Sequence, residues 1–122
     1  MNEVTDEQIE SFHKNGFLVM KGFYDQNEIN EIRGWVYDYA NRKSNEWIAG
    51  KEMAYYETSK NDGTRILARI ENFLEYHEGF KNLTNSKKLM NCVESLLGNK
   101  AVIFKEKINF KKPGGGGFKP HQ

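Results

Sequence analysis

Three polar side chains alternate with apolar ones in a short stretch of the sequence, and their types suit the binding of an anion. Lys105, Lys107 and Asn109 fall on one side of an extended chain, because the side chains of a strand point alternately to opposite faces. Lysine supplies positive charge, and asparagine supplies a directional amide donor. One interpretation is therefore a barrel whose inner face binds a small acidic ligand. The alternative is a half-exposed strand whose polar side meets water.

Glu106 interrupts this alternation, because it points to the same side as Phe104 and Ile108. A carboxylate among apolar side chains needs a partner. Three basic residues are candidates for that partner: Lys100, Arg69 and Arg65.

The chain has three histidines, and their surroundings differ. His13 lies in a predicted helix, and His77 stands between a tyrosine and a glutamate. We expect a role in packing or at the surface for both. His121 is different, because it follows a run of glycines and a proline.

Three helices are predicted to carry the N-terminal part of the fold. The first follows a capping box at residues 5–8 and ends near Gly16. The second has a similar start signal at residues 25–28 and runs to about Arg42. The third is capped at its start by a serine and ended by a glycine, over residues 86–98.

Strands are predicted from short apolar or alternating runs. Residues 17–20 fit a buried strand, and residues 101–110 form the clearest one. Residues 65–73 begin like a strand, although their apolar positions also fit a turn of helix. Residues 43–63 hold either a strand or a loop. In the clearest strand one side is apolar, and it consists of Val102, Phe104, Ile108 and Phe110.

A low-complexity run covers residues 113–117, where four glycines follow a proline. Such a run makes a flexible chain and could be an artificial linker. The strand before it and the Phe-Lys-Pro-His sequence after it are unlike a tag, which favours a loop of the natural fold.

The composition fits one soluble domain and excludes several classes of partner. Basic and acidic residues nearly balance, at 18 and 17, so charge gives no reason to expect nucleic acid or an anionic membrane. No apolar run approaches the roughly 20 residues that span a bilayer. The start of the chain lacks a signal-peptide pattern, so we expect a cytoplasmic location. The single cysteine, Cys92, lies in an apolar helical stretch and is expected to be packed.

The stretch from Phe104 to Gln122 resembles the segment that leads into the His-x-Asp iron motif of the phytanoyl-CoA dioxygenase family. Residues 5–8 and 16–23 are similar to the usual opening of that family. Residues 69–73, Arg-Ile-Glu-Asn-Phe, resemble a segment of its bacterial members. The resemblance therefore covers nearly the whole chain.

This resemblance implies an α+β fold in which N-terminal helices pack on the first strands of a double-stranded β-helix, a jelly-roll or cupin-like barrel that is incomplete in this chain. Residues 1–122 would be the N-terminal part of a single domain, truncated within the His-x-Asp motif. In the family an aspartate, a second histidine and an arginine that holds 2-oxoglutarate follow downstream.

The resemblance also implies an iron(II)- and 2-oxoglutarate-dependent dioxygenase that uses O2 to hydroxylate a small organic substrate. His121 would be the first iron ligand, and Asn109 would contact 2-oxoglutarate. Lys105 and Lys107 are weaker candidates for the same co-substrate or for an acidic substrate. Arg69 and Glu71 are candidates for a substrate contact or for a structural ion pair. One ligand of a two-histidine, one-carboxylate site does not fix iron, so we expect this chain alone to be inactive.

Two other functions remain open at this point. The chain could be a non-catalytic fragment or degenerate relative that binds a partner. It could instead be a small α+β module that binds an anion on the face of Lys105, Lys107 and Asn109. Members of the resembled family act on acyl-CoA thioesters, small amines, phosphonates and natural products, so the family name does not imply a phytanoyl substrate.

Overall fold

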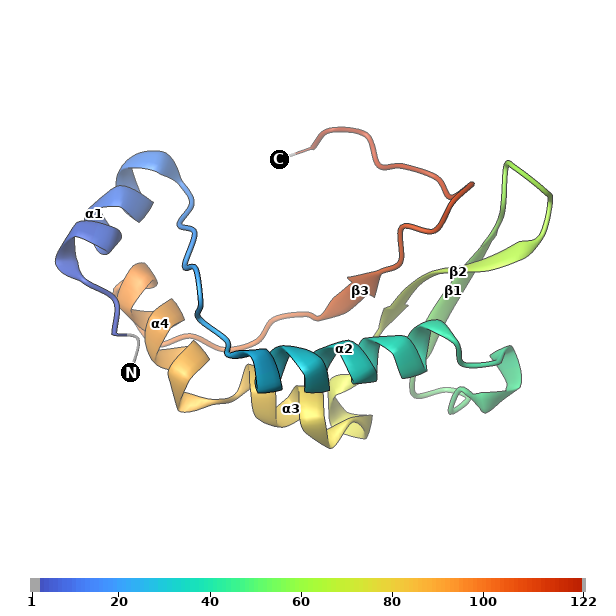
Figure 1. The fold of residues 1–122 in the computed structure, drawn as a ribbon, viewed down its shortest axis with the longest axis horizontal. Coiled ribbons are helices and arrows are strands. Elements are labelled where there is room, and N and C mark those ends of the chain that lie inside the picture. The colour runs from blue at the N-terminus through green and yellow to red at the C-terminus, as the bar shows by residue number, and fades with distance from the viewer. Residues whose placement is uncertain (1–2, 122) are drawn as a thin grey trace. The chain divides into compact units, whose positions relative to one another are not determined.

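The computed structural model describes residues 3–121, which form two compact units (Figure 1). The helical unit comprises residues 3–35 and 77–104, and the sheet unit comprises residues 36–76 and 105–121. Each unit is thus built from two separate stretches of the chain. Met1 and Asn2 of the polar start, and Gln122 after His121, lie outside the described residues, so the predictions that involve them are not tested.

The helical unit contains the predicted helices and one more. Its helices are α1 (Asp6–Asn15), the first part of α2 (Gln26–Ala40), α3 (Glu78–Thr84) and α4 (Lys87–Leu97). Helix α1 lies beside α4 (Figure 1), and α3 also contacts α4. Cys92 of α4 is buried, with its sulfur 3.3 Å from that of Met20, which confirms that the cysteine is packed.

The capping signals in the sequence act as predicted. The hydroxyl of Thr5 accepts a hydrogen bond from the amide of Gln8, whose side chain accepts one from the amide of Thr5. Ser86 accepts from an amide in the first turn of α4. Gly16 and Gly98, which end α1 and α4, adopt the left-handed conformation that glycine reaches without steric cost.

Helix α3 was not predicted, and an unusual residue begins it. His77 accepts a hydrogen bond from the amide of Phe80 through Nδ1, at 3.0 Å. Its ring also lies 5.3 Å from that of Trp35 and 4.7 Å from that of Phe80. The packing role expected for His77 is confirmed. Histidine is not a preferred N-cap residue, so the sequence carried no clear start signal here.

The buried strand predicted at residues 17–20 is wrong. This stretch is irregular, and Phe17 and Val19 are 63% and 68% exposed. Within residues 3–121 it pairs with no strand. An apolar run becomes a strand only where a second strand satisfies its backbone groups.

The sheet unit is built on three antiparallel strands in the order β1-β2-β3 (Figure 1). They are β1 (Met53–Thr58), β2 (Arg65–Glu71) and β3 (Lys107–Asn109), and two short 3-10 helices, η1 (Ser44–Glu46) and η2 (Leu74–Tyr76), accompany them. The uncertain stretches 43–63 and 65–73 thus each contain a strand. The buried apolar residues of this unit are Tyr39, Leu67, Ile70, Phe73 and Leu74.

A β-bulge explains why residues 65–73 also looked helical. The pairing of β1 with β2 shifts between Tyr55 and Tyr56 and leaves Ala68 of β2 without an opposite residue. An extra residue reverses the alternation of faces. Leu67 and Ile70 are therefore both buried although they are three positions apart, which is helical spacing.

The strand predicted at residues 101–110 is mostly wrong, because only β3 forms. Val102 and Phe104 are 90% and 96% exposed, and they do not lie on a buried face. β3 starts at Lys107, which pairs with the last residue of β2. The next residue, Asn72, has a φ of 56° and leads the chain out of the strand, so β2 offers no partner further along.

The partner predicted for Glu106 is also wrong. Its carboxylate accepts a hydrogen bond from the backbone amide of Leu74, at 3.2 Å, and none of the three candidate basic residues pairs with it. Leu74 is the first residue of η2, so its amide lacks a partner within that turn. Glu106 thus ties the entry of β3 to η2.

The fold class is α+β, as expected. Within residues 3–121, no helix combines the length and the apolar character that crossing a membrane requires.

Candidate functional site

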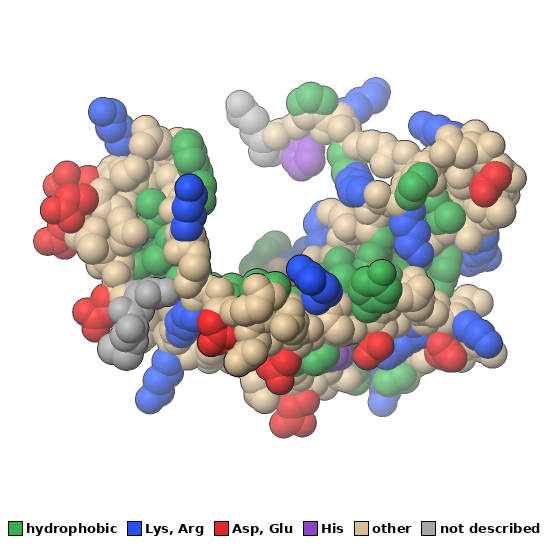
Figure 2. Space-filling view, in the orientation of Figure 1, with side chains coloured by type: hydrophobic (Ala, Val, Ile, Leu, Met, Phe, Trp, Pro, Cys, Tyr) green, Lys and Arg blue, Asp and Glu red, His purple; other side chains and the backbone are tan. Residues whose placement is uncertain are grey.

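One face of the sheet collects the polar side chains singled out in the sequence. Asn109 pairs with Arg69 and Lys107 pairs with Glu71 across β3 and β2, so their side chains lie on the same side of the sheet. Lys105 joins them through an ion pair with Glu71. We call these five residues the polar sheet face. Figure 2 shows lysine and arginine side chains gathered over this part of the molecule.

Glu71 organises the cations of this face. One of its oxygens lies 3.4 Å from Nε of Arg69 and 3.6 Å from Nζ of Lys105. The Glu71 side chain is largely buried, whereas that of Lys105 is mostly exposed. The ion pair with Arg69 is therefore better shielded from solvent than the pair with Lys105.

Arg69 is held in place by an aromatic ring as well. Its guanidinium carbon stands 4.0 Å from the centre of the Tyr55 ring, a cation–π geometry. Nε of Arg69 is buried and makes no hydrogen bond within the described residues. The contact with Glu71 is close enough for an ion pair, but its geometry does not make a hydrogen bond.

A small hollow of about 30 Å³ opens beside this face. Arg69 and Asn109 line it from the sheet, and Gly116 and Phe118 line it from the glycine run. Such a space holds one or two atoms of the size of a water oxygen. Glu57 also lines the hollow, but its carboxylate accepts a hydrogen bond from the amide of Gly116.

The glycine run is part of the folded sheet unit, which argues against an artificial linker. Besides the contact of Gly116 with Glu57, the carbonyl of Gly114 accepts from the amide of Lys60, at 2.9 Å. Gly114 has a φ of 84°, and a Cβ atom there would clash with the hydroxyl of Ser59, the residue after β1. Both observations favour a glycine at position 114.

The glycine run brings the chain back over the polar sheet face. The ring of Phe118 lies 4.2 Å from Nζ of Lys111 and 5.7 Å from Nζ of Lys107. His121 follows three residues later, and three residues span at most about 10 Å. His121 is exposed, and its Nδ1 lies 3.0 Å from the carbonyl of Lys119.

The structure thus brings Lys105, Lys107 and Asn109 to one face of the sheet. Of the predicted site residues only Asn109 lines the hollow, and Lys105, Lys107 and His121 do not. Residues 3–121 contain no group of three or more histidine, cysteine, aspartate or glutamate side chains that could hold a metal ion. An imidazole suits iron, so His121 fits as one ligand of a larger set, but it cannot hold the metal alone.

Two residues of the site were missed in the sequence. Tyr55 supports Arg69, and Glu57 fixes the glycine run. Both lie in the stretch that could not be assigned to a strand, and the bulge hid which face each of them occupies. No local pattern would have revealed the contact of Glu57, which joins residues far apart in the sequence.

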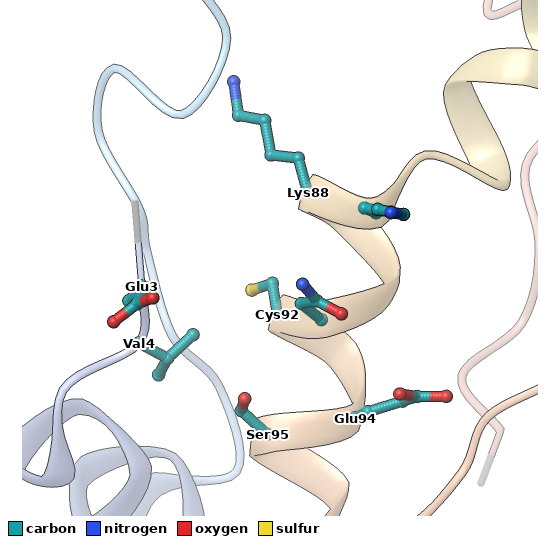
Figure 3. A pocket seen from close by; sticks show the side chains of 8 residues that line it. Glu3, Val4, Lys88, Cys92, Glu94 and Ser95 are labelled. Carbon is teal, nitrogen blue, oxygen red and sulfur yellow. The ribbon is translucent and has the colours of Figure 1, made fainter. Parts of the chain in front are cut away.

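The helical unit has a larger hollow of about 630 Å³ between the N-terminal segment and α4 (Figure 3). Val4, Lys88, Cys92 and Ser95 are among its lining residues. Burial raises the pKa of the Cys92 thiol, which disfavours the nucleophilic thiolate. The polar sheet face therefore remains the better candidate for binding chemistry.

Known proteins similar to this chain carry names of oxygenases. A 2-aminoethylphosphonate dioxygenase from the uncultured bacterium HF130_AEPn_1 is 42% identical over 124 residues, covering 100% of this chain and 45% of the relative. A methylphosphonate hydroxylase from Gimesia maris is 34% identical, covering 98% and 44%. A probable alpha-ketoglutarate-dependent hypophosphite dioxygenase from Stutzerimonas stutzeri is 25% identical, covering 95% and 40%.

This chain spans less than half the length of these curated relatives. A whole protein family also matches this chain, because the sequence pattern of that family fits residues 12–122. That match covers both the polar sheet face and His121. The chain belongs to the phytanoyl-CoA dioxygenase (PhyH) family.

Proposed function

We propose that residues 1–122 are the N-terminal part of one dioxygenase domain that uses iron(II), 2-oxoglutarate and O2 to oxidise a small phosphorus-containing acid. The observation that carries the proposal is the polar sheet face, over which the glycine run leads toward His121. The names of the three relatives support it, since two name a phosphonate and the third names a probable alpha-ketoglutarate-dependent hypophosphite dioxygenase.

In this proposal His121 is the first iron ligand, and the remaining ligands come from residues outside the 122 of this sequence. Bound iron with 2-oxoglutarate supplies the activation of oxygen. Asn109 donates its amide to 2-oxoglutarate and so orients it. Lys105 and Lys107 attract the acidic ligands, because lysine offers charge without a fixed direction.

We further propose that β1, β2 and β3 are the first strands of a double-stranded β-helix. The short β3, which has only three residues, supports an incomplete sheet. Strands supplied by additional residues would extend the sheet and pair its open edge.

A second candidate function is an anion-binding module without catalysis. The observation that favours it is that all five residues of the polar sheet face lie together, whereas residues 3–121 hold no group of side chains that could bind a metal ion. Both functions share anion binding, and only the oxygenase requires His121.

A hybrid protein tests the proposed function. This chain replaces the matching segment of the 2-aminoethylphosphonate dioxygenase, to which it is 42% identical. We expect iron-dependent formation of succinate from 2-oxoglutarate in the presence of 2-aminoethylphosphonate. The 122-residue chain alone should form none. A hybrid that folds and loads iron but never releases succinate would contradict the oxygenase and favour the binding module.

A further inference from the structure

The polar sheet face carries more positive charge than its own carboxylate can neutralise. Arg69, Lys105 and Lys107 provide three cations, and Glu71 provides the one carboxylate among the five residues of the face. Two positive charges therefore remain. A purely structural ion pair would need only Arg69 and Glu71, so the exposed Lys105 and Lys107 are left to attract an anionic ligand from solvent.

Arg69 is the best-positioned of these cations. The Tyr55 ring and Glu71 restrict its guanidinium from two sides, which lowers the entropic cost of binding an anion. A planar guanidinium pairs with an oxyanion through two parallel hydrogen bonds. Its Nε is buried beside Glu71, whereas 32% of the Arg69 side chain is exposed, so part of this side chain is open to an additional acceptor.

The hollow next to Arg69 offers a place for that acceptor. It has room for one or two oxygen-sized atoms, and Asn109 lines it beside Arg69. Glu57 stands at the same hollow and accepts from the amide of Gly116, and its negative charge faces the positive charge of Lys111, which lines the hollow too. An oxyanion would therefore place one oxygen by Arg69 and keep the others over the open, lysine-bearing face.

We propose that Arg69, positioned by Glu71 and Tyr55, anchors a subsite for the doubly charged phosphonate group of the substrate, next to the 2-oxoglutarate contact at Asn109. This inference rests on the proposed function, because it takes its substrate class from there. Arg69 and Asn109 face each other across β2 and β3. The inference assigns the phosphonate group to Arg69 and 2-oxoglutarate to Asn109.

The test measures binding of methylphosphonate to the 122-residue chain by isothermal titration calorimetry, without iron. Arg69→Gln should raise the dissociation constant at least about tenfold, since charge-assisted hydrogen bonds contribute enough for that factor. Arg65→Gln is the matched control, because Arg65 also lies on β2 and its guanidinium stands 4.6 Å from the Tyr56 ring. This control should bind as the unchanged chain does.

Two further comparisons guard against misfolding and against general charge effects. Arg69→Lys keeps the charge but loses the planar fork, so its affinity should fall between those of the unchanged chain and Arg69→Gln. Dimethyl methylphosphonate, an uncharged ester, should not bind. Far-ultraviolet circular dichroism of each variant should match that of the unchanged chain.

Several results would overturn the subsite. They are the absence of methylphosphonate binding to the unchanged chain, an equal loss in Arg69→Gln and Arg65→Gln, and an effect of Arg69→Gln on 2-oxoglutarate alone. In the hybrid protein, turnover with an Arg69→Gln variant whose KM for phosphonate is unchanged would defeat this inference and leave the oxygenase intact. Phosphonate binding that depends on Arg69, in a hybrid without turnover, would support the subsite and contradict the oxygenase.

Discussion

The best-buried charge of the sheet unit is Glu52, and its surroundings show how single residues stabilise this chain. Glu52 is 7% exposed and lies 3.1 Å from a guanidinium nitrogen of Arg42. It also accepts from the amide of Ile48. The guanidinium of Arg42 in turn stands within 5 Å of the rings of Tyr39 and Trp47. The carboxylate is thus paired and hydrogen-bonded, as a buried charge must be.

We expect Arg42→Met to lower the free energy of unfolding by about 3–5 kcal/mol, because it leaves the buried Glu52 carboxylate without its partner. Denaturant titration in dilute solution measures this change. Arg33→Met, at an exposed position of α2, is the control and should change little. If Arg42→Met with Glu52→Gln is no more stable than Arg42→Met alone, the unpaired charge is not the cause.

A second expectation concerns the stability of the chain in alkali. Burial and, to a smaller extent, the charge of Glu52 raise the pKa of Tyr39 to about 12, and the charge of Arg42 opposes them. Between pH 10 and about 12 the Tyr39 hydroxyl therefore keeps its proton in the folded state, whereas it loses the proton in the unfolded state. Stability should be unaffected below pH 10 and should fall above it, by up to roughly 2–3 kcal/mol.

The difference between the unchanged chain and Tyr39→Phe isolates this contribution, because other groups titrate in the same range. Denaturation at pH 8, 10 and 11 should show a steeper loss in the unchanged chain than in Tyr39→Phe. Tyr37→Phe, at an exposed position of the same helix, serves as the control. Parallel pH profiles for the unchanged chain and Tyr39→Phe would contradict the expectation.

At the scale of elements, helices with capping residues were predictable and strands without partners were not. The signals around Thr5, Asp25 and Ser86 are local, and all three helices form. β3 depends on where β2 ends, at Asn72, and no local pattern contains that information. The bulge at Ala68 also made β2 hard to predict, because it gave the buried residues of a strand the spacing of a helix.

A substitution in the glycine run tests whether this run is fixed against Ser59, the residue after β1. We expect Gly114→Ala to destabilise the chain by about 1–3 kcal/mol, because φ is positive there and the new methyl group would meet Ser59. Gly117→Ala is the matched control, since no atom lies within 4 Å of its Cβ position and its φ is not positive. Thermal unfolding of both variants measures the difference, and equal melting temperatures would mean that the run is not fixed against Ser59.

At the scale of the whole molecule, this chain shows large apolar side chains in solvent. Val102 and Phe104 are the most exposed of them within residues 3–121. Side chains of this kind mark surfaces that another segment or chain covers. The candidate site was predictable only in part. Its polar residues lie close together in sequence, whereas the contribution of Arg69 and Glu71 required the pairing of β2 with β3.

We expect the 122-residue chain to self-associate, and we expect Val102→Ser with Phe104→Ser to reduce that association. Sedimentation velocity over a range of concentrations measures it. Substitution of Lys100 and Lys119 by serine, at two exposed polar positions, is the control and should leave the association in place. A monodisperse monomer with a sharp cooperative thermal transition would count against an incomplete barrel and favour the independent binding module.

The iron content of the hybrid protein tests the central claim most directly. Elemental analysis is performed on the hybrid and on its His121→Ala and His13→Ala variants, the latter changing a histidine of α1 as the matched control. We expect one iron per chain and full turnover in the hybrid and in His13→Ala. We expect loss of both in His121→Ala, because it removes a direct ligand. A His121→Ala hybrid with full iron and full activity would contradict the assignment.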